Sequence, residues 1–318
     1  MTSTMPMPGG EAVAAVSQNG RRPSEVYGPV GRSPWLDIDW REHQRWTIVH
    51  GQPVNTIDLG SGSPIVFVHG LTGSWPNWLE QLPVLAAEHR VIAMDLPGSG
   101  HSPMPRERIS ISGYARLLDG LFDELQIDSA AVVGNSMGGF VSAELAIAFP
   151  QRVERLALVA PAGLSTYHDP RATRALPALR RLEPALAACT AWGAANADAI
   201  ARRPRLREVI LGVLTSHPSL LGAPLTAELV RGGGGKPGFM QSLEANLDYH
   251  VRDRLSEIAC PTLIVWGERD RVVTARDADV YAELIPGSRK VMFEDTGHLA
   301  MVERPAAFNA LLKEFLSE

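Results

Sequence analysis

The feature that most constrains the fold of this chain is the alternation of short, continuous apolar runs with segments of helical periodicity. Apolar runs of about four to eight residues, bounded by turn residues, are typical of strands buried on both faces of a sheet. Such runs stand at PIVFVHG (64–70), RVIAMDL (90–96), AAVVG (130–134), RLALVA (155–160) and PTLIVWG (261–267). Strands separated by helices imply βαβ crossovers, so we predict an α/β fold with a mostly parallel central sheet and helices on both faces.

The segments around these runs complete the sheet domain. Residues 111–126 carry apolar side chains along one side of a helix, as expected for a helix that packs on a sheet. We expect a hairpin formed by 47–50 and 54–59, a last strand at 289–293, and helices over 77–88, 111–126, 137–149, 275–285 and 305–316.

The alternation stops near residue 162 and resumes near residue 261. Between these points the pattern is helical, with leucines at near-helical spacing at Leu176, Leu179, Leu182 and Leu186. We therefore predict a helical cap, or lid, at 163–256, inserted into a core domain made of 34–162 and 257–318. Four consecutive glycines at 232–235 are expected to form a loop or hinge within this cap, because glycine disfavours helix.

The first 33 residues have a different composition from the rest of the chain. They are rich in Gly, Pro, Ser and Thr and contain few large apolar side chains. A segment of this kind cannot bury enough apolar surface to offset the entropy of ordering it. We expect residues 1–33 to form a disordered tail and order to begin near Ser33.

Composition excludes several classes of function. The net charge of −5 provides no basic field for nucleic acid, and Cys189 and Cys260 lie far apart without a metal-binding pattern. The sequence has no apolar stretch long enough to span a membrane, and its beginning lacks the order of a secretory signal. These features favour a cytoplasmic protein that acts on a small molecule without a metal or cofactor.

The pentapeptide Gly134-Asn135-Ser136-Met137-Gly138 follows an apolar strand and precedes a helix. A G-x-S-x-G sequence in this context is typical of a nucleophile elbow, a sharp turn that holds the serine in strained torsions and needs small neighbours. The turn also places the hydroxyl at a helix N-terminus, where N–H groups favour developing negative charge. The sequence alone is a weak signal, but its position between strand and helix makes Ser136 the candidate nucleophile.

A serine hydroxyl needs a base, and that base needs an orienting carboxylate. His298 follows the last predicted strand and precedes the last helix, at the sheet edge where Ser136 also lies. Asp270 follows the strand at 261–267 and is the candidate carboxylate. Its rivals are Glu268, which lies closer to the strand end than the pattern requires, and Asp295, which lies close in sequence to His298. The chain order Ser, Asp, His is typical of one fold that uses this chemistry.

Charge on a tetrahedral intermediate needs at least two preorganised donors. One donor is expected to be the backbone N–H of Met137, which follows the serine. The other is expected to be the backbone N–H of Leu71, which follows His69-Gly70 at the end of another strand.

Five blocks of sequence, PIVFVHG, DLPGSGHS, VVGNSMGG, WGERD and DTGH, resemble the signature blocks of the α/β-hydrolase superfamily in their order. The resemblance covers roughly 46–160 and 258–316. It implies the α/β-hydrolase fold, with Ser136, Asp270 and His298 on the triad positions and Leu71 and Met137 in the oxyanion hole. The segment GNSMGG is similar to that of meta-cleavage-product carbon–carbon bond hydrolases and to that of many esterases, whereas the loop after His69-Gly70 departs from the carbon–carbon hydrolase pattern.

Three functions remain under consideration. The first is hydrolysis of a small-molecule carboxylic ester through an acyl-enzyme on Ser136. The second is cleavage of a carbon–carbon bond in a vinylogous diketo acid, for which an arginine of the cap would bind the carboxylate. The third is a non-catalytic binding role, since a fold does not determine function. Asp95, Ser99, His101 and Ser102, which lie in one turn, are interpreted mainly as structural. For Trp75 and Trp78, near the oxyanion loop, two interpretations stay open: they wall an acyl pocket, or they pack under the loop.

Overall fold

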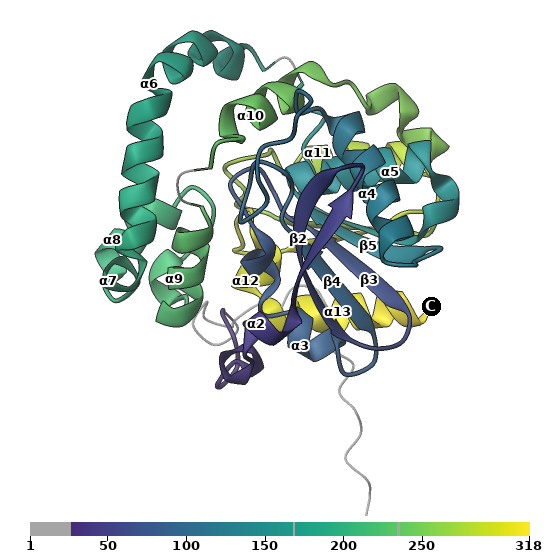
Figure 1. Cartoon of the computed structure of the whole chain (residues 1–318), viewed down its shortest axis with the longest axis horizontal. Helices are drawn as coiled ribbons and strands as arrows, with labels where there is room; N and C mark the ends of the chain where they lie inside the picture. Colours follow the sequence, from purple (N-terminus) through teal and green to yellow (C-terminus); the bar gives the residue numbers. More distant parts are fainter. Residues whose placement is uncertain (1–26, 168, 234–235) are drawn as a thin grey trace, which may run out of the picture.

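The computed structural model describes residues 27–167, 169–233 and 236–318, and its strands form one eight-stranded sheet (Figure 1). The spatial order is β1-β2-β4-β3-β5-β6-β7-β8, in which β1, β2 and β4 pair antiparallel and all later pairs are parallel. The strands are β1 (Gln44–Val49), β2 (Gln52–Gly60), β3 (Pro64–Val68), β4 (Arg90–Met94), β5 (Ala130–Asn135), β6 (Val153–Val159), β7 (Thr262–Gly267) and β8 (Arg289–Phe293). The mostly parallel sheet that the apolar runs predict is therefore confirmed.

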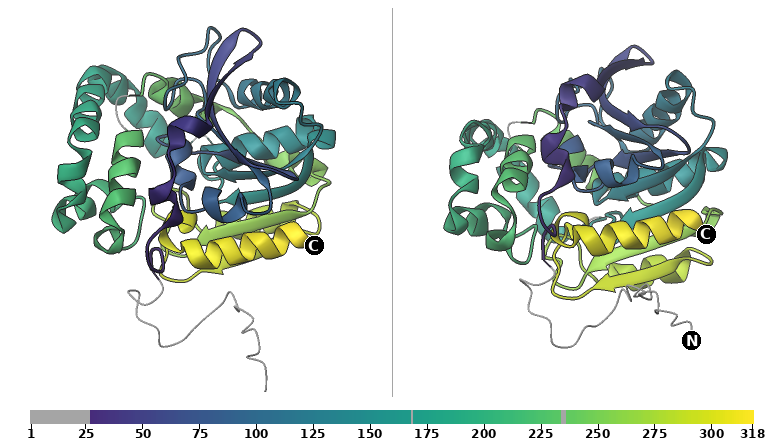
Figure 2. Two further views of the ribbon diagram at one scale, coloured as in Figure 1. Left: turned by 60° about the horizontal axis from the view of Figure 1, so that its bottom comes forward. Right: turned by 90° about the horizontal axis from the view of Figure 1, so that it is seen from below.

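Helices cover both faces of this sheet, as the two turned views in Figure 2 show. The helices outside the inserted segment are α2 (Trp40–His43), α3 (Leu82–Leu85), α4 (Ile111–Glu124), α5 (Met137–Ala148), α11 (Asp277–Leu284), α12 (Ala300–Glu303) and α13 (Pro305–Ser317). Successive side chains of a strand point to opposite faces. Accordingly, Val66 and Val68 of β3 pack with α4, α5 and α11, whereas Ile65 and Phe67 pack with α3, α12 and α13.

One expected helix differs from the structure. The segment 77–88 does not form one continuous helix but a 3-10 turn (Trp75–Trp78) followed by the single turn α3. Proline favours the first helical positions because its missing N–H would have no partner there. Pro76 and Pro83 each stand at the start of one of these turns, so the segment restarts instead of continuing.

In its described residues, the segment between β6 and β7 contains no strand. Its α-helices are α6 (Pro170–Ala195), α7 (Ala197–Ala201), α8 (Pro204–Leu211), α9 (Ala223–Gly232) and α10 (Phe239–Asp248), and it also has 3-10 helices at Pro218–Leu220 and Arg252–Glu257. In Figure 1, α6 stands at the outer edge of the molecule, and none of its side chains is buried. The run of four glycines begins with the last residue of α9, and its positions 234 and 235 lie outside the described residues. Among the described residues, no helix has the length and apolar character needed to cross a bilayer.

The first described residues do not match the expected tail. Tyr27 is only 7% exposed, and its hydroxyl donates a hydrogen bond of 2.7 Å to Glu303. Ser33 is also buried and donates to Glu80. Tyr27 therefore departs from the expected disordered tail, because a partner far along the chain holds a residue that composition alone marks as loose, whereas Ser33 lies where order was expected to begin. Positions 1–26 of the expected tail lie outside the described residues.

The start of α5 is packed directly on the end of β3. A Cβ atom on Gly138 would lie 2.1 Å from the carbonyl oxygen of Val68, so a side chain there must displace backbone. We expect Gly138→Ala to lower the free energy of unfolding by ~2 kcal/mol or more, measured by urea denaturation. Gly193→Ala is the matched control, because this glycine of α6 has open space around its Cβ position. Alanine should there raise stability by up to ~1 kcal/mol, and equal effects at the two sites would contradict this account.

Candidate functional site

Ser136 stands at the sharp turn between β5 and α5. Its backbone torsions are φ 56° and ψ −120°, a strained combination for a residue with a side chain. Two backbone hydrogen bonds hold it there: its N–H donates to Val159 at 2.9 Å, and its carbonyl accepts from Ala162 at 3.1 Å. A Cβ atom on Gly134 would lie 2.4 Å from the carbonyl oxygen of Gly138. Gly134 is therefore required by its close approach to Gly138, and Gly138 by its close approach to Val68.

His298 lies in the loop after β8, and its ring is fixed by Asp270 in the loop after β7. The His298 Nδ1 atom lies 2.7 Å from Asp270 Oδ2, and both side chains are almost completely buried. The other carboxylate oxygen accepts hydrogen bonds from the N–H groups of Val272 and Val273, at 2.8 and 3.0 Å. Since a carboxylate accepts, Nδ1 carries the proton and Nε2 is left as an acceptor.

The two rival carboxylates are placed differently. Asp295 pairs with Arg269 at 2.6 Å and with His217 at 2.8 Å, and Glu268 is exposed to solvent. Asp270 is thus the carboxylate that contacts His298. The side chain of Asn135, beside the serine, also reaches this loop, since its amide donates to the carbonyl oxygens of Val159 (3.0 Å) and His298 (3.4 Å).

The loop after β3 is held by a buried histidine. The His69 Nε2 atom accepts from the N–H of Leu96 at 3.0 Å, so its Nδ1 carries the proton and donates to the carbonyl of Gly70 at 2.7 Å. Burial lowers the pKa of His69, in keeping with a neutral ring. In a trans peptide the N–H of the next residue points opposite to the carbonyl. His69 therefore directs the N–H of Leu71 away from its own ring.

A buried carboxylate, Glu303 of α12, organises the loop that carries His298. Its oxygens accept hydrogen bonds from the N–H of Gly297 at 2.9 Å and of Leu299 at 3.3 Å, the two residues that flank His298. Burial raises the pKa of Glu303, and the N–H donors act in the opposite direction. Sequence reasoning missed this residue, because a single glutamate near a helix end gives no signal that distinguishes it from a solvated one.

The same carboxylate joins this loop to two distant segments. It accepts from the N–H of Ser216, in the inserted segment, at 2.8 Å and from the hydroxyl of Tyr27 at 2.7 Å. The inserted segment also holds the histidine directly, since the N–H of His298 donates to the carbonyl of Leu214 at 2.9 Å. The position of His298 is thus coupled to the inserted helices.

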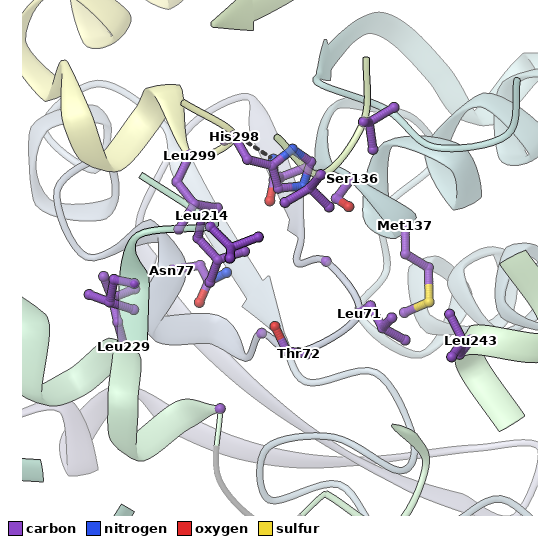
Figure 3. A pocket seen from close by; sticks show the side chains of 18 of the residues that line it. Leu71, Thr72, Asn77, Ser136, Met137, Leu214, Leu229, Leu243, His298 and Leu299 are labelled. Carbon is purple, nitrogen blue, oxygen red and sulfur yellow. Dashed lines mark hydrogen bonds between the residues drawn. The ribbon is translucent and has the colours of Figure 1, made fainter. Parts of the chain in front are cut away.

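A pocket with a volume of about 630 Å³ opens where these loops meet the inserted helices. Ser136, Met137, His298 and Leu71 all line it, and Figure 3 shows the ring of His298 next to Ser136. Most other lining side chains are apolar, and most of these apolar side chains come from the inserted helices. They include Trp192, Ile200, Ile210, Leu211, Leu229, Val230, Leu243 and Leu247. Met137 is the first residue of α5, so its N–H has no acceptor within the helix.

The polar turn at 95–102 has the structural role that we expected. The Asp95 carboxylate is fully buried and accepts from the side chain of Asn55 and the N–H groups of Trp75 and His101, at 2.8 to 2.9 Å. Trp78 packs on Phe67 beneath the sheet and not in the pocket. In the described part of the chain, no three His, Cys, Asp or Glu side chains gather as metal ligands would.

The sequence matches the α/β-hydrolase fold family over residues 63–305, and the chain belongs to this family. It is 30% identical to a 2-hydroxy-6-oxo-2,4-heptadienoate hydrolase of Pseudomonas putida over 86% of this chain and 96% of that protein. It is 33% identical to the dihydrolipoyllysine-residue acetyltransferase component of an acetoin cleaving system of Cupriavidus necator. That match covers 81% of this chain, which spans only 64% of that relative.

Solved structures share the architecture. An enol-lactonase from Burkholderia xenovorans superposes with a TM-score of 0.67 at 26% identity, over 86% of this chain and all of the other. A meta-cleavage product hydrolase from Pseudomonas fluorescens gives a TM-score of 0.67 at 25% identity, over 87% and 98% of the two chains. The α/β-hydrolase fold that the sequence blocks imply is confirmed, and the chain is similar both to a protein named as an enol-lactonase and to proteins named as a meta-cleavage product hydrolase and a 2-hydroxy-6-oxo-2,4-heptadienoate hydrolase.

The buried carboxylate of the His298 loop offers a test of that loop's stability. In Glu303→Gln, an amide NH₂ group replaces one acceptor oxygen and faces N–H donors. We expect the free energy of unfolding to fall by ~2 kcal/mol or more, as for other hydrogen bonds to a buried charge, measured by urea denaturation. Glu283→Gln, at an exposed position of α11, is the control and should change stability by no more than ~0.5 kcal/mol. Equal effects would contradict the proposed role.

The neutral ring of His69 predicts a pH dependence of stability. Because burial depresses its pKa in the folded chain below the ordinary value of 6.5, the unfolded chain binds the proton first as the pH falls. The contribution of the neutral His69 ring to the free energy of unfolding is complete above pH 6.5. It is lost as the pH falls below this value, by up to ~1.4 kcal/mol per pH unit. Urea denaturation at pH 7.5 and 5.5 should show a larger loss for the natural protein than for His69→Gln, and an identical loss would rule out this contribution.

Proposed function

We propose that this protein is a serine hydrolase that cleaves a small, neutral carboxylic ester through an acyl-enzyme on Ser136. The observation that carries the proposal is the Ser136 hydroxyl at the strained turn, in the same pocket as a histidine whose Nδ1 is held by Asp270. This arrangement leaves Nε2 of His298 as the base on the pocket side. The pocket and the inserted helices above it would act as a cap that selects the substrate.

In the proposed mechanism, Ser136 Oγ attacks the ester carbonyl while His298 Nε2 takes the hydroxyl proton. The tetrahedral intermediate collapses, the alkoxide leaves, and it receives the proton from His298. A water molecule, deprotonated by the same ring, then attacks the acyl-enzyme and releases the acid. Asp270 stays ionised throughout and stabilises the imidazolium that forms twice in each cycle.

The oxyanion would be stabilised by two backbone donors. One is the N–H of Met137, the first residue of α5, which has no acceptor within the helix. The other is the N–H of Leu71, whose direction is set by the hydrogen bond from His69 Nδ1 to the carbonyl oxygen of Gly70. Such donors are already oriented in the resting protein. They therefore stabilise the charge as it develops, without a cost of reorientation during the reaction.

The charge of the pocket supports ester cleavage over cleavage of a vinylogous diketo acid. Besides His298, the ionisable side chains in the lining are Asp169 and Cys189, so the described lining offers no cation. A carboxylate moved from water into an apolar site without a partner charge costs several kcal/mol, on the order of the penalties for buried ions. A dienoate substrate would therefore be disfavoured, whereas a neutral ester would not.

Three arginines of the inserted helices bind groups outside the pocket lining. Arg180 pairs with Glu244 at 2.6 Å, Arg231 with Asp198 at 3.1 Å, and Arg207 donates to backbone carbonyls. The second candidate, a carbon–carbon bond hydrolase, is favoured by the similarity to a 2-hydroxy-6-oxo-2,4-heptadienoate hydrolase and to a meta-cleavage product hydrolase. It requires a cation to enter the pocket, and none lies in the described lining.

A comparison of substrates tests the proposal. We expect purified protein to hydrolyse neutral short- and medium-chain esters, and Ser136→Ala to lower kcat by ~10⁴ or more. The variant should also lose labelling by a fluorophosphonate, whereas Ser142→Ala, which changes a buried serine of α5 outside the pocket, should keep it. A higher kcat/KM for a 2-hydroxy-6-oxo-dienoate than for every ester would favour the second candidate. Unchanged activity in Ser136→Ala would show that the activity does not arise from this serine, and would point to a contaminating hydrolase and to a non-catalytic binding role for this protein.

A further inference from the structure

Exposed apolar side chains stand at the entrance of the pocket. Trp192, Ile210, Val213 and Val272 all line the pocket, and each is also exposed to solvent, Trp192 to 64%. A side chain that borders both the cavity and the solvent lies where one opens into the other. A substrate therefore passes exposed apolar groups when it enters the pocket.

This apolar surface continues along α6 and α8. Leu182, Leu186 and Cys189 follow one face of α6, and Cys189 lines the pocket. Both leucines are exposed, as is Val209 of α8, which lies about one helical turn before Val213. In Figure 1, α7 and α8 lie at the C-terminal end of α6, so the exposed side chains of both helices meet at this pocket. We call the following six exposed side chains the entrance surface: Leu182, Leu186, Trp192, Val209, Ile210 and Val213.

The position of the entrance surface indicates what covers it. Soluble proteins rarely expose a large contiguous apolar patch unless it is a contact site, and none of the 26 residues of α6 is buried. A protein partner seated on this surface would close the entrance to the substrate. A lipid layer would instead supply apolar molecules at the point where the pocket opens. The geometry therefore favours a lipid layer over a protein.

The charge of the inserted helices indicates which kind of lipid. Residues 170–211 contain eight arginines and three acidic residues, whereas the whole chain has a net charge of −5. A negatively charged surface thus attracts this side of the molecule and repels the rest. On α8, Arg205 lies one helical turn before Val209 of the entrance surface. Six arginines are exposed and form no ion pair with another described residue: Arg171, Arg174, Arg181, Arg202, Arg203 and Arg205.

We propose that the entrance surface docks on an anionic lipid layer, and that the substrates are apolar esters held in that layer. The apolar side chains enter the headgroup region, where tryptophan is favoured because its ring is apolar and its N–H is polar. The arginines bind the lipid phosphates through their several N–H donors. The substrate class rests on the ester hydrolysis proposed above, whereas the docking does not.

Vesicle binding tests the role of charge. In a sedimentation assay, Ser136→Ala, which leaves esters intact, should bind vesicles of equal parts phosphatidylglycerol and phosphatidylcholine at least about tenfold more tightly than phosphatidylcholine vesicles. This preference should weaken as added salt screens the charges. Changing Arg202, Arg203 and Arg205 together to glutamine should lower the affinity for the mixed vesicles at least about tenfold, since each arginine contributes about fivefold. The control changes three exposed arginines elsewhere to glutamine and should keep the affinity: Arg45, Arg106 and Arg116.

A second pair of variants tests the apolar side chains. Leu182→Ser combined with Val209→Ser changes two exposed positions outside the pocket lining. It should weaken binding to the mixed vesicles at least about tenfold, because less apolar surface leaves water. With Ser136 present, it should keep kcat/KM for a water-soluble ester and lower the rate on an ester dissolved in these vesicles. The control is Trp46→Ser combined with Ile48→Ser, at positions of β1 that are 55% and 54% exposed, and it should bind as the natural protein does.

Three results would overturn the docking: equal affinity for the two kinds of vesicle, equal effects of the variants and their controls, or no binding to either vesicle. A protein that instead forms a dimer, and becomes a monomer in Leu182→Ser combined with Val209→Ser, would also refute it, because a second copy then covers the surface. Ester hydrolysis without vesicle binding leaves the proposed function intact. Vesicle binding without hydrolysis of any ester supports the docking and overturns both the proposed function and the substrate class.

Discussion

The contact between the first turn of α5 and the end of β3 is the constraint on which the rest of the site depends. Gly138 has no side chain, and its Cα lies so close to Val68 and His69 that a Cβ atom would overlap their carbonyl oxygens. This approach brings the N-terminus of α5 next to the loop after β3. It thereby places the two N–H groups that we propose as oxyanion donors, those of Met137 and Leu71, on adjacent segments, and Ser136 holds its strained torsions at the same turn.

A second set of contacts fixes the position of His298 next to this turn. His298 lies on a loop, which would be mobile without support, but Glu303 binds the N–H groups on both sides of it. Asp270 orients the ring, while the carbonyl of Leu214 accepts from the backbone of His298. The buried carboxylate thus fixes the backbone of the His298 loop by hydrogen bonds, whereas the glycines fix the turn at Ser136 by allowing close backbone contact. Ser216 and Tyr27 donate hydrogen bonds to the same carboxylate. A displacement of the inserted segment would therefore change the position of His298.

The sequence predicts those parts of the molecule that rest on local pattern. The buried strands, the elbow and the order of Ser136, Asp270 and His298 all follow from apolar runs and from residues at strand ends. It fails where a tertiary partner decides, as with Glu303, which looks like a solvated residue near a helix end until its neighbours are known. It also fails at Tyr27, whose burial depends on partners far along the chain, and at 77–88, where two prolines interrupt an otherwise helical pattern.

The charges of the molecule are separated in a way that bears on its substrate. Arg180 and Arg231 of the inserted helices bind Glu244 and Asp198, Arg207 donates to backbone carbonyls, and the described lining of the pocket has no basic side chain other than that of His298. An apolar lining discriminates against an ionised group by the cost of burying it, whereas a cation would discriminate in favour of an acid by attraction. The first device selects neutral molecules, and the second selects acids. We therefore propose that the inserted helices determine which carbonyl reaches Ser136, so that this arrangement of serine, histidine and aspartate does not by itself fix the bond that is cleaved.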